Sequence, residues 1–162
     1  MPKQFGTGYA QDIEVHPHLW LTIFNCEYHN DVLLKIPDWD HPLEFSVWLS
    51  GRVIEGGMQI GDGYMHIAGS GVQRKVMVEY PKSRNIGIDI NTSPDLLANF
   101  FSGEEREIPK ELRFLAKGND WQTLLYPEIT TDVQGVAQQI INCPYQAITK
   151  QNVFANQGFG TD

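Results

Sequence analysis

The stretch LEFSVWLSGRVIEGGMQIGDGYMHIAGSG, residues 43–71, decides the fold of this chain. Short apolar or alternating runs follow one another in it, and glycines separate them. A period of two places successive side chains on opposite faces, as in a β-strand, and glycine allows the positive φ angles that tight connections need. We therefore expect three strands here, at Leu43–Leu49, Gln59–Gly61 and Tyr64–Ala68.

The same pattern runs through the first ninety residues, where ten of the fifteen glycines lie. It predicts five further strands, at Tyr9–Val15, Leu19–Tyr28, Val32–Ile36, Val72–Val78 and Asn85–Ile90. About eight short strands at close spacing favour a barrel or a jelly roll, because such folds leave few sheet edges unpaired.

The pattern changes after residue 92, where we expect three helices. Ser93 before Pro94 is typical of a helix start, because the serine side chain caps free N–H groups and proline suits the first turn. Thr131 and Gln134 have the spacing of a capping box in front of the longest apolar stripe. The predicted helices are Pro94–Phe101, Pro109–Lys117 and Asp132–Asn142.

The fold class that follows is α+β, a β barrel or jelly roll followed by a cluster of about three short helices. A chain of 162 residues, 41% of them hydrophobic, has the size of one domain. We expect this domain to span residues 1–150, with the β part at about 8–91 and the helical part at about 93–143. Residues 151–162 lack apolar periodicity and are expected to form a loose tail.

The charge of the chain argues against several partners. Its formal net charge is −8, and the sequence holds no basic run. Nucleic-acid binding depends on Lys and Arg that neutralise phosphates, so we expect no direct binding of nucleic acid and no binding to an anionic membrane. No apolar stretch could span a bilayer and Met1–Phe5 lacks a secretion signal, which predicts a cytoplasmic protein. Cys26 and Cys143 are expected to be buried free thiols.

Five histidines are the first candidates for chemistry: His16, His18, His29, His41 and His66. Pro17 is disfavoured within a paired strand, so the His16 and His18 pair is expected in a solvated turn rather than on a metal-binding strand face. No third ligand at metal spacing, nucleophile elbow or phosphate loop accompanies them. We therefore predict no metal, no cofactor and no catalytic residue, and a chain that is not an enzyme.

Acidic and aromatic side chains are the other candidates. Asp38, Asp40 and Glu44 are expected in a solvated acidic loop beside Trp39. Strand alternation places bulky aromatic rings beside polar side chains, a mixture that suits a pocket for a small organic ligand. We predict a pocket inside the barrel, and the alternative is ordinary packing of buried aromatics. The predicted ligand-binding residues are Trp20, Tyr28, Trp48 and His66.

Several segments carry a resemblance to a known family. Gly8–Gln11, Leu19–Ile23, His41–Ser46 and Leu49–Gly51 resemble the N-terminal part of AraC-type transcription regulators. Later segments strengthen the resemblance, which covers roughly residues 6–150: Trp121–Pro127, Gln138–Ile140 and Cys143–Gln146. The most similar branch is that of the ferric-siderophore regulator PchR.

The resemblance implies a cupin-like barrel that senses an effector, and helices that make dimer contacts. A ferric siderophore or a similar aromatic molecule is the expected effector. A homodimer is expected, in which the stripe on the last helix meets its own copy. Burial of that stripe against the chain's own barrel is the alternative. The predicted dimer residues are Val133, Val136, Ala137 and Ile140.

The resemblance also implies a linker and two helix-turn-helix units, where this sequence has residues 151–162 instead. We therefore expect a sensing and dimerisation domain without its own DNA-binding part. Two alternatives from other classes stay open. One is a small metal-dependent cupin enzyme that holds its ion with His16, His18, His29 or His66. The other is an interaction module that pairs with a full-length regulator.

Overall fold

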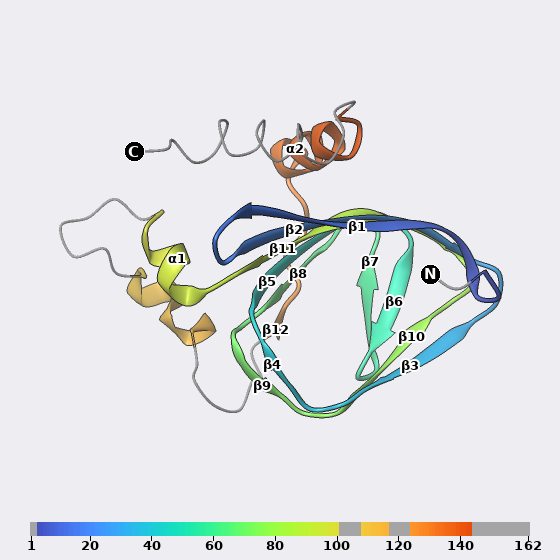
Figure 1. Ribbon diagram of the computed structural model, residues 1–162, viewed down its shortest axis with the longest axis horizontal. Helices are drawn as coiled ribbons and strands as arrows, with labels where there is room; N and C mark the ends of the chain where they lie inside the picture. The colour runs from blue at the N-terminus through green and yellow to red at the C-terminus, as the bar shows by residue number, and fades with distance from the viewer. Residues whose placement is uncertain (1–2, 101–107, 117–123, 144–162) are drawn as a thin grey trace.

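The computed structural model describes residues 3–100, 108–116 and 124–143, which form a β barrel followed by helices (Figure 1). This order confirms the predicted α+β fold class. The strands are β1 (Gly6–His16), β2 (Leu19–Tyr28), β3 (Val32–Ile36), β4 (Trp39–His41), β5 (Leu43–Ser50), β6 (Arg52–Glu55), β7 (Met58–Gly61), β8 (Met65–Ala68), β9 (Gly71–Gln73), β10 (Val76–Tyr80), β11 (Arg84–Thr92) and β12 (Leu124–Leu125). The helices are α1 (Pro94–Ala98), a 3-10 helix (Lys110–Leu115) and α2 (Thr131–Ile141).

The strands pair as one long hairpin that is wound into a barrel. β6 pairs with β7 at the tip, and outward from it β5 pairs with β8, β4 with β9, β3 with β10 and β2 with β11, all antiparallel. This nested pairing is the pattern of a jelly roll, and it confirms the prediction of a barrel or jelly roll. A large sheet (β1-β2-β11-β5-β8-β12) faces a small one (β3-β10-β6-β7), and the β4–β9 pair lies at one end.

Glycines permit the close approach of strands near the tip of this hairpin. Gly61 has a φ of +138°, and a Cβ built there would lie 2.2 Å from the carbonyl oxygen of Gly51. Gly51 itself has a φ of +88°, and a Cβ there would lie 1.9 Å from Asn85 Oδ1. Side chains at either position would therefore both strain the backbone and clash with a neighbour.

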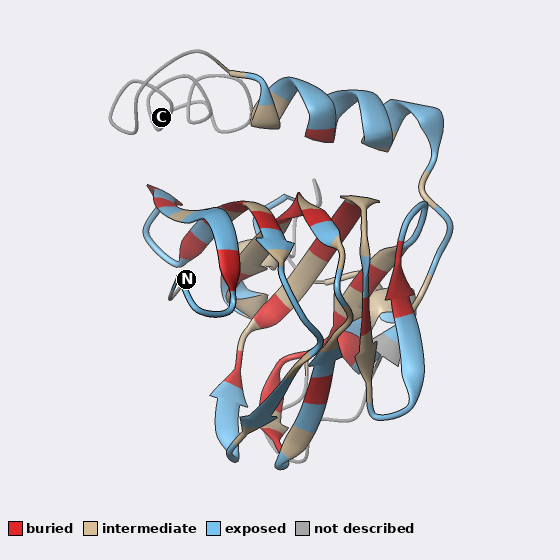
Figure 2. Ribbon diagram, turned by 90° about the vertical axis from the view of Figure 1, so that its right-hand side faces the viewer, coloured by how far each residue is buried: buried red, intermediate tan, exposed pale blue. Residues whose placement is uncertain are grey.

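The two faces of the large sheet have different cores. The outer face packs against α2 through a cluster that includes Leu21, Ile23, Val47 and Ile88. Figures 1 and 2 show α2 lying across this face, with its outward side exposed. Inside the barrel, a second apolar cluster fills only part of the space between the sheets and consists of Phe24, Trp48, Val53, Ile60 and Val78.

The helices begin close to where the sequence predicted. Ser93 caps α1, because its hydroxyl accepts a hydrogen bond from the backbone N–H of Leu96 at 3.1 Å. For α2, however, Thr130 and not Thr131 is the cap: its hydroxyl accepts from the N–H of Val133. None of the described helices is long and apolar enough to cross a membrane.

Some strand predictions were incomplete. The predicted run Val72–Val78 is two strands, since Arg74 and Lys75 interrupt it between β9 and β10. The short strands β4, β6 and β12 were missed, because runs of two to four residues show too little alternation to be recognised. The histidine pair does lie at a turn, with Pro17 and His18 as turn residues. The predicted tail at 151–162 lies outside the described residues.

Candidate functional site

A cavity of about 190 Å³ lies inside the barrel, between the large and the small sheet. We call it the inner cavity. The same strands that send apolar side chains to α2 send alternate, mostly polar, side chains into this space. On β5, for example, Glu44, Ser46 and Trp48 line the cavity, while Val47 packs on the outer face. The full lining is Ile36, Trp39, His41, Glu44, Ser46, Trp48, Val53, Glu55, Ile60, His66, Gln73, Val78, Tyr80 and Asp89.

Glu44 is the centre of a polar cluster in this cavity. Its Oε1 accepts a hydrogen bond from the hydroxyl of Ser46 at 3.1 Å and lies 3.7 Å from Nδ1 of His66. Its Oε2 lies 3.9 Å from Nε2 of His41. His41 ends β4, which directly precedes β5 in the chain, and His66 lies on β8, which pairs with β5. The pairing of β5 with β8 therefore brings two distant parts of the sequence together, the segment from His41 to Ser46 and His66.

The protonation of His41 follows from its neighbours. Its Nδ1 lies 2.5 Å from the carbonyl oxygen of Pro42, and a carbonyl can only accept, so Nδ1 carries the proton and donates. Burial is the main effect that lowers the pKa of His41, which favours the neutral ring. In that ring Nε2 is an acceptor, and it faces the carboxyl group of Glu44.

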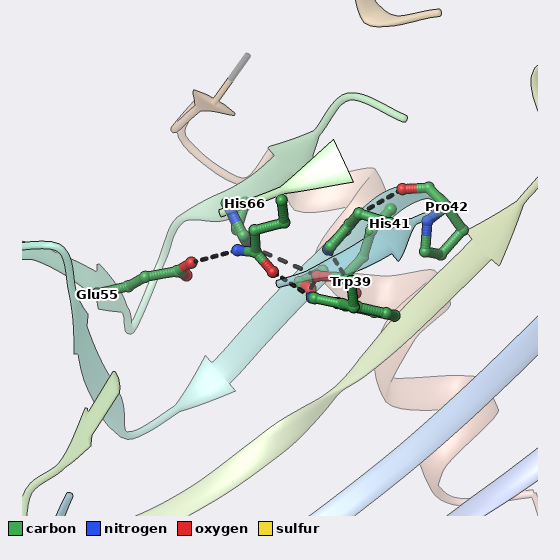
Figure 3. Close-up of polar contacts among 8 residues, drawn as sticks. Trp39, His41, Pro42, Glu55 and His66 are labelled. Atoms are coloured by element: carbon green, nitrogen blue, oxygen red, sulfur yellow. Dashed lines mark hydrogen bonds and ion pairs between the residues drawn. The ribbon is translucent and has the colours of Figure 1, made fainter. Parts of the chain in front are cut away.

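A second polar chain crosses the cavity from the other side. The indole N–H of Trp39 donates to Oε1 of Gln73, and Nε2 of Gln73 donates to Oε1 of Glu55 at 3.2 Å. Figure 3 shows Glu55 reaching from one side towards the group formed by Trp39, His41 and His66. The amide of Gln73 is thus held in one orientation by both partners.

Burial shifts the protonation of the whole cluster. It raises the pKa of Glu44 to about 7, with a smaller opposing effect of the Ser46 hydrogen bond. Burial, together with repulsion from Glu44, raises the pKa of Asp89 to about 7. Burial, with a smaller contribution from the charge of His41, lowers the pKa of His66 to about 4. Near neutral pH the histidines are uncharged and the two acids are partly protonated.

A second, larger hollow opens at one end of the barrel. This outer hollow has a volume of about 510 Å³ and is more exposed to solvent than the inner cavity. Its lining comes from the start of β2, the end of β11 and the β4–β9 pair, and it includes Trp20. His41 lines both the outer hollow and the inner cavity, so this one side chain lies between the two spaces.

Comparison with known proteins identifies the family. Residues 5–151 match the family described as the N-terminal domain of the regulatory protein PchR. The chain belongs to the family of PchR N-terminal domains. The resemblance seen in the sequence is therefore confirmed. No curated protein matches the chain.

One similar solved structure is that of oxalate decarboxylase from Bacillus subtilis at pH 4.6. The sequences are 14% identical and the TM-score is 0.39. The match covers 79% of this PchR N-terminal domain and 39% of the other chain, so the domain spans well under two thirds of that protein's length.

The predicted ligand-binding residues of this PchR N-terminal domain fall into three places. Trp48 and His66 line the inner cavity. Trp20 is 43% exposed and lines the outer hollow instead. Tyr28 lines neither space; its ring packs on Tyr80 with 5.0 Å between centroids. The structure therefore brings together only two of the four residues.

Other members of the inner cavity were missed or misplaced. Glu44 was expected in a solvated loop, but it lies in β5 with its carboxyl group inside the barrel. The alternation of Glu44 with Ser46 and Trp48 along the strand was the sequence pattern that could have placed its side chain inside the barrel. No sequence pattern indicated that Glu55 and Asp89 line the cavity, because the sequence does not show which face of β6 or β11 points inward. Asp38 and Asp40 are exposed, as expected.

The histidines of the metal alternative do not come together. His16, His18 and His29 are exposed, whereas His66 is buried in the inner cavity. Among the described residues, no group of three or more His, Cys, Asp or Glu side chains could hold a metal ion. Of the two cysteines, Cys26 is buried and Cys143 is partly buried, and both are free thiols.

The predicted dimer residues lie on α2. Ala137 is 1% exposed and belongs to the core of the outer sheet face, and Val133 and Ile140 pack against that core. Val136 is 56% exposed. Most of the stripe is therefore occupied by the chain's own barrel in this PchR N-terminal domain, and the dimer stays a prediction.

Proposed function

We propose that this chain is the effector-sensing domain of a transcription regulator in the cytoplasm, with its effector site at the outer hollow. The supporting observation is the position of His41, which lines the outer hollow and also contacts the Glu44 cluster inside the barrel. A ligand that displaces His41 would change the polar cluster, and through β5 the sheet on which α2 packs. Membership of the PchR N-terminal family supports a regulatory role.

The effector that we propose is a ferric siderophore or a similar aromatic molecule. Pockets for ligands of drug size have volumes of about 300–1,000 Å³. The outer hollow, at about 510 Å³, is in this range, whereas the inner cavity of about 190 Å³ is below it. The exposed indole of Trp20 offers a stacking surface for such a ligand.

A melting-temperature screen with iron-loaded and iron-free siderophores tests this proposal. Binding to the folded state alone stabilises it by about 2.7 kcal/mol at a hundredfold excess over the dissociation constant. Trp20→Leu should abolish the shift and the accompanying tryptophan quenching. Tyr9→Leu is the matched control, because Tyr9 is a similarly exposed aromatic residue, 45% exposed, outside the hollow. No shift with any siderophore, or an unchanged shift in Trp20→Leu, would refute the proposal.

We further propose that the domain binds its ligand without catalysing a reaction and that it forms a homodimer. The separation of His16, His18 and His29 from His66 supports the first part. Metal analysis of protein purified without chelators tests it, because stoichiometric metal would favour the metal-dependent enzyme. The exposed position of Val136 on α2 leaves room for a contact with a second copy.

A further inference from the structure

Hydrogen-bond acceptors exceed donors in the inner cavity. Three of the donors there bond to groups of the cavity itself: Ser46 donates to Glu44, Trp39 to Gln73, and Gln73 to Glu55. The indole N–H of Trp48 and the hydroxyl of Tyr80 are further donors in the lining. The carboxyl groups of Glu44, Glu55 and Asp89 are the hydrogen-bond acceptors that line the cavity.

His66 provides an independent sign that a ligand completes this cavity. The side chain is 6% exposed, and its Nε2 is buried without a hydrogen-bond partner among the described residues. When Glu44 is ionised, as it would be beside a bound cation, the proton of His66 lies on Nδ1, which is 3.7 Å from Oε1 of Glu44, and Nε2 is an acceptor. A buried acceptor without a partner is costly, so a donor from outside the chain would stabilise it.

The charge and the walls of the cavity specify the kind of donor. Three carboxyl groups line the space, and none of its described lining residues is a lysine or arginine. The rings of Trp39, Trp48 and Tyr80 form part of the wall, and aromatic faces attract cations. The volume of about 190 Å³ equals that of roughly six water molecules, taking about 30 Å³ for each. It therefore suits a small ligand.

From these contacts we infer that the inner cavity binds a small organic cation with N–H donors, a primary ammonium compound. The ammonium group donates to Glu44 and Nε2 of His66, and the rest of the ligand lies against the aromatic walls. The site is distinct from the outer hollow, and it does not depend on the effector proposed there.

The protonation of the empty cavity agrees with this site. Without a cation Glu44 and Asp89 partly retain their protons near pH 7, since burial raises the pKa of each to about 7. An ammonium group would take the place of those protons, so binding should release protons near pH 7. His41 and His66, with lowered pKa values, are neutral at this pH and contribute none.

A matched set of three probes tests the inference: benzylamine, benzyl alcohol and benzoate, which share one shape and differ in charge. Isothermal titration calorimetry at pH 7, in two buffers of different ionisation enthalpy, measures both affinity and proton release. We expect benzylamine to bind at least about tenfold more tightly than the other two and to release protons, because a hydrogen bond to a charged group is stronger than a neutral one. Equal affinity for benzyl alcohol, or no binding of benzylamine, would overturn the inference.

Substitutions locate the site. Glu44→Gln keeps the shape of the side chain and should weaken benzylamine binding about tenfold or more. Glu79→Gln is the control, because Glu79 is an exposed carboxylate on β10 next to the cavity residue Val78. If Glu44→Gln does not fold, Glu55→Gln tests the opposite side of the cavity in the same way. Unchanged affinity in the folded variant would overturn the assignment.

One further variant separates this inference from the proposed function. Trp20→Leu alters the outer hollow and should leave benzylamine binding unchanged. If Trp20→Leu abolishes benzylamine binding, the amine binds in the outer hollow and the inner site is wrong. If siderophores fail to bind while benzylamine binds, the siderophore proposal fails alone.

Discussion

The outer and inner faces of the large sheet differ in what they bury. On β11, Ile88 points to the outer face and is 2% exposed, whereas its neighbour Asp89 points into the inner cavity. On β5, Val47 and Ser46 are both 3% exposed and face opposite ways. Many barrels are filled with apolar side chains inside; here α2 covers an apolar outer face, and polar groups share the interior.

This comparison indicates that the two faces of the same strands have different roles: the outer face stabilises the fold, and the inner face carries the polar groups of the proposed ligand site. Burial of apolar area contributes about 25 cal/mol per Å², so the apolar cluster on the outer face stabilises the fold. The inner face can therefore hold buried acids and histidines, which cost stability. Four substitutions test this division, from the largest expected effect to the smallest.

Ile88→Ala removes a fully packed side chain from the outer face. We expect a loss of about 2–5 kcal/mol in the free energy of unfolding, because a cavity remains where the side chain was. Urea denaturation measures the change. Ile88→Val, which removes one methylene, should cost about 0.5–1.5 kcal/mol. A loss below 1 kcal/mol for the alanine variant would show that the outer face contributes little.

Ile140→Glu separates the two roles of α2. Ile140 packs on the sheet, so we expect the variant to lose about 1.5–3 kcal/mol of stability, or to unfold. Val136→Glu, at an exposed position, should keep the fold and, if the dimer forms through α2, give a folded monomer. Circular dichroism and light scattering distinguish these outcomes. A stable, folded monomer from Ile140→Glu would instead make the stripe a dimer interface.

Asp89→Asn tests the inner face through its pH dependence. The pKa of Asp89 is raised to about 7, so the folded protein binds a proton that the unfolded chain releases at lower pH. The stability from this proton is present at acidic pH and is lost as the pH rises to about 7. Relative to the parent, the variant should therefore gain on the order of 1–2 kcal/mol between pH 5.5 and pH 7.5.

Urea midpoints at several pH values measure this difference. His41 and His66 have lowered pKa values and act in the opposite direction between about pH 4 and 6.5, but they are present in both proteins. The difference in stability between the parent and the variant therefore reports the protonation of Asp89. A stability difference that does not change with pH would contradict the raised pKa.

Thr130→Ala is expected to change the free energy of unfolding least of the four substitutions. Loss of the hydroxyl that caps α2 should destabilise the protein by about 1 kcal/mol and loosen the cover of the outer face. Thr131→Ala is the matched control, since Thr131 is the first residue of the helix and not its cap. Equal losses in the two variants would show that the cap contributes nothing specific.

Local patterns were enough to predict most of the fold. Strands β2 and β3 begin and end at the predicted residues, because their apolar runs are bounded by turn residues. The helix starts followed from Ser93 and from the stripe on α2. The cap of α2 was placed one residue late, since two threonines stand side by side and either could have been the cap.

The site was harder to predict, because it depends on pairing between distant strands. Alternation placed Trp48 on a polar strand face, and it lies in the inner cavity. It could not show that Glu44 meets two histidines from β4 and β8, or that Trp20 and Trp48 lie in different spaces. Nor could it show that α2 covers the sheet, since an apolar stripe fits a second chain equally well.

The nested pairing of the strands also has a kinetic consequence. Glu55 pairs with Met58 at the tip of the hairpin, while Leu19 pairs with Thr92 at its open end. Each pair that forms shortens the loop that the next pair must close, so we expect folding to proceed outward from the tip. Pulsed hydrogen exchange during refolding should protect the amides of β6 and β7 before those of β2 and β11. Early protection of β2 would exclude this order.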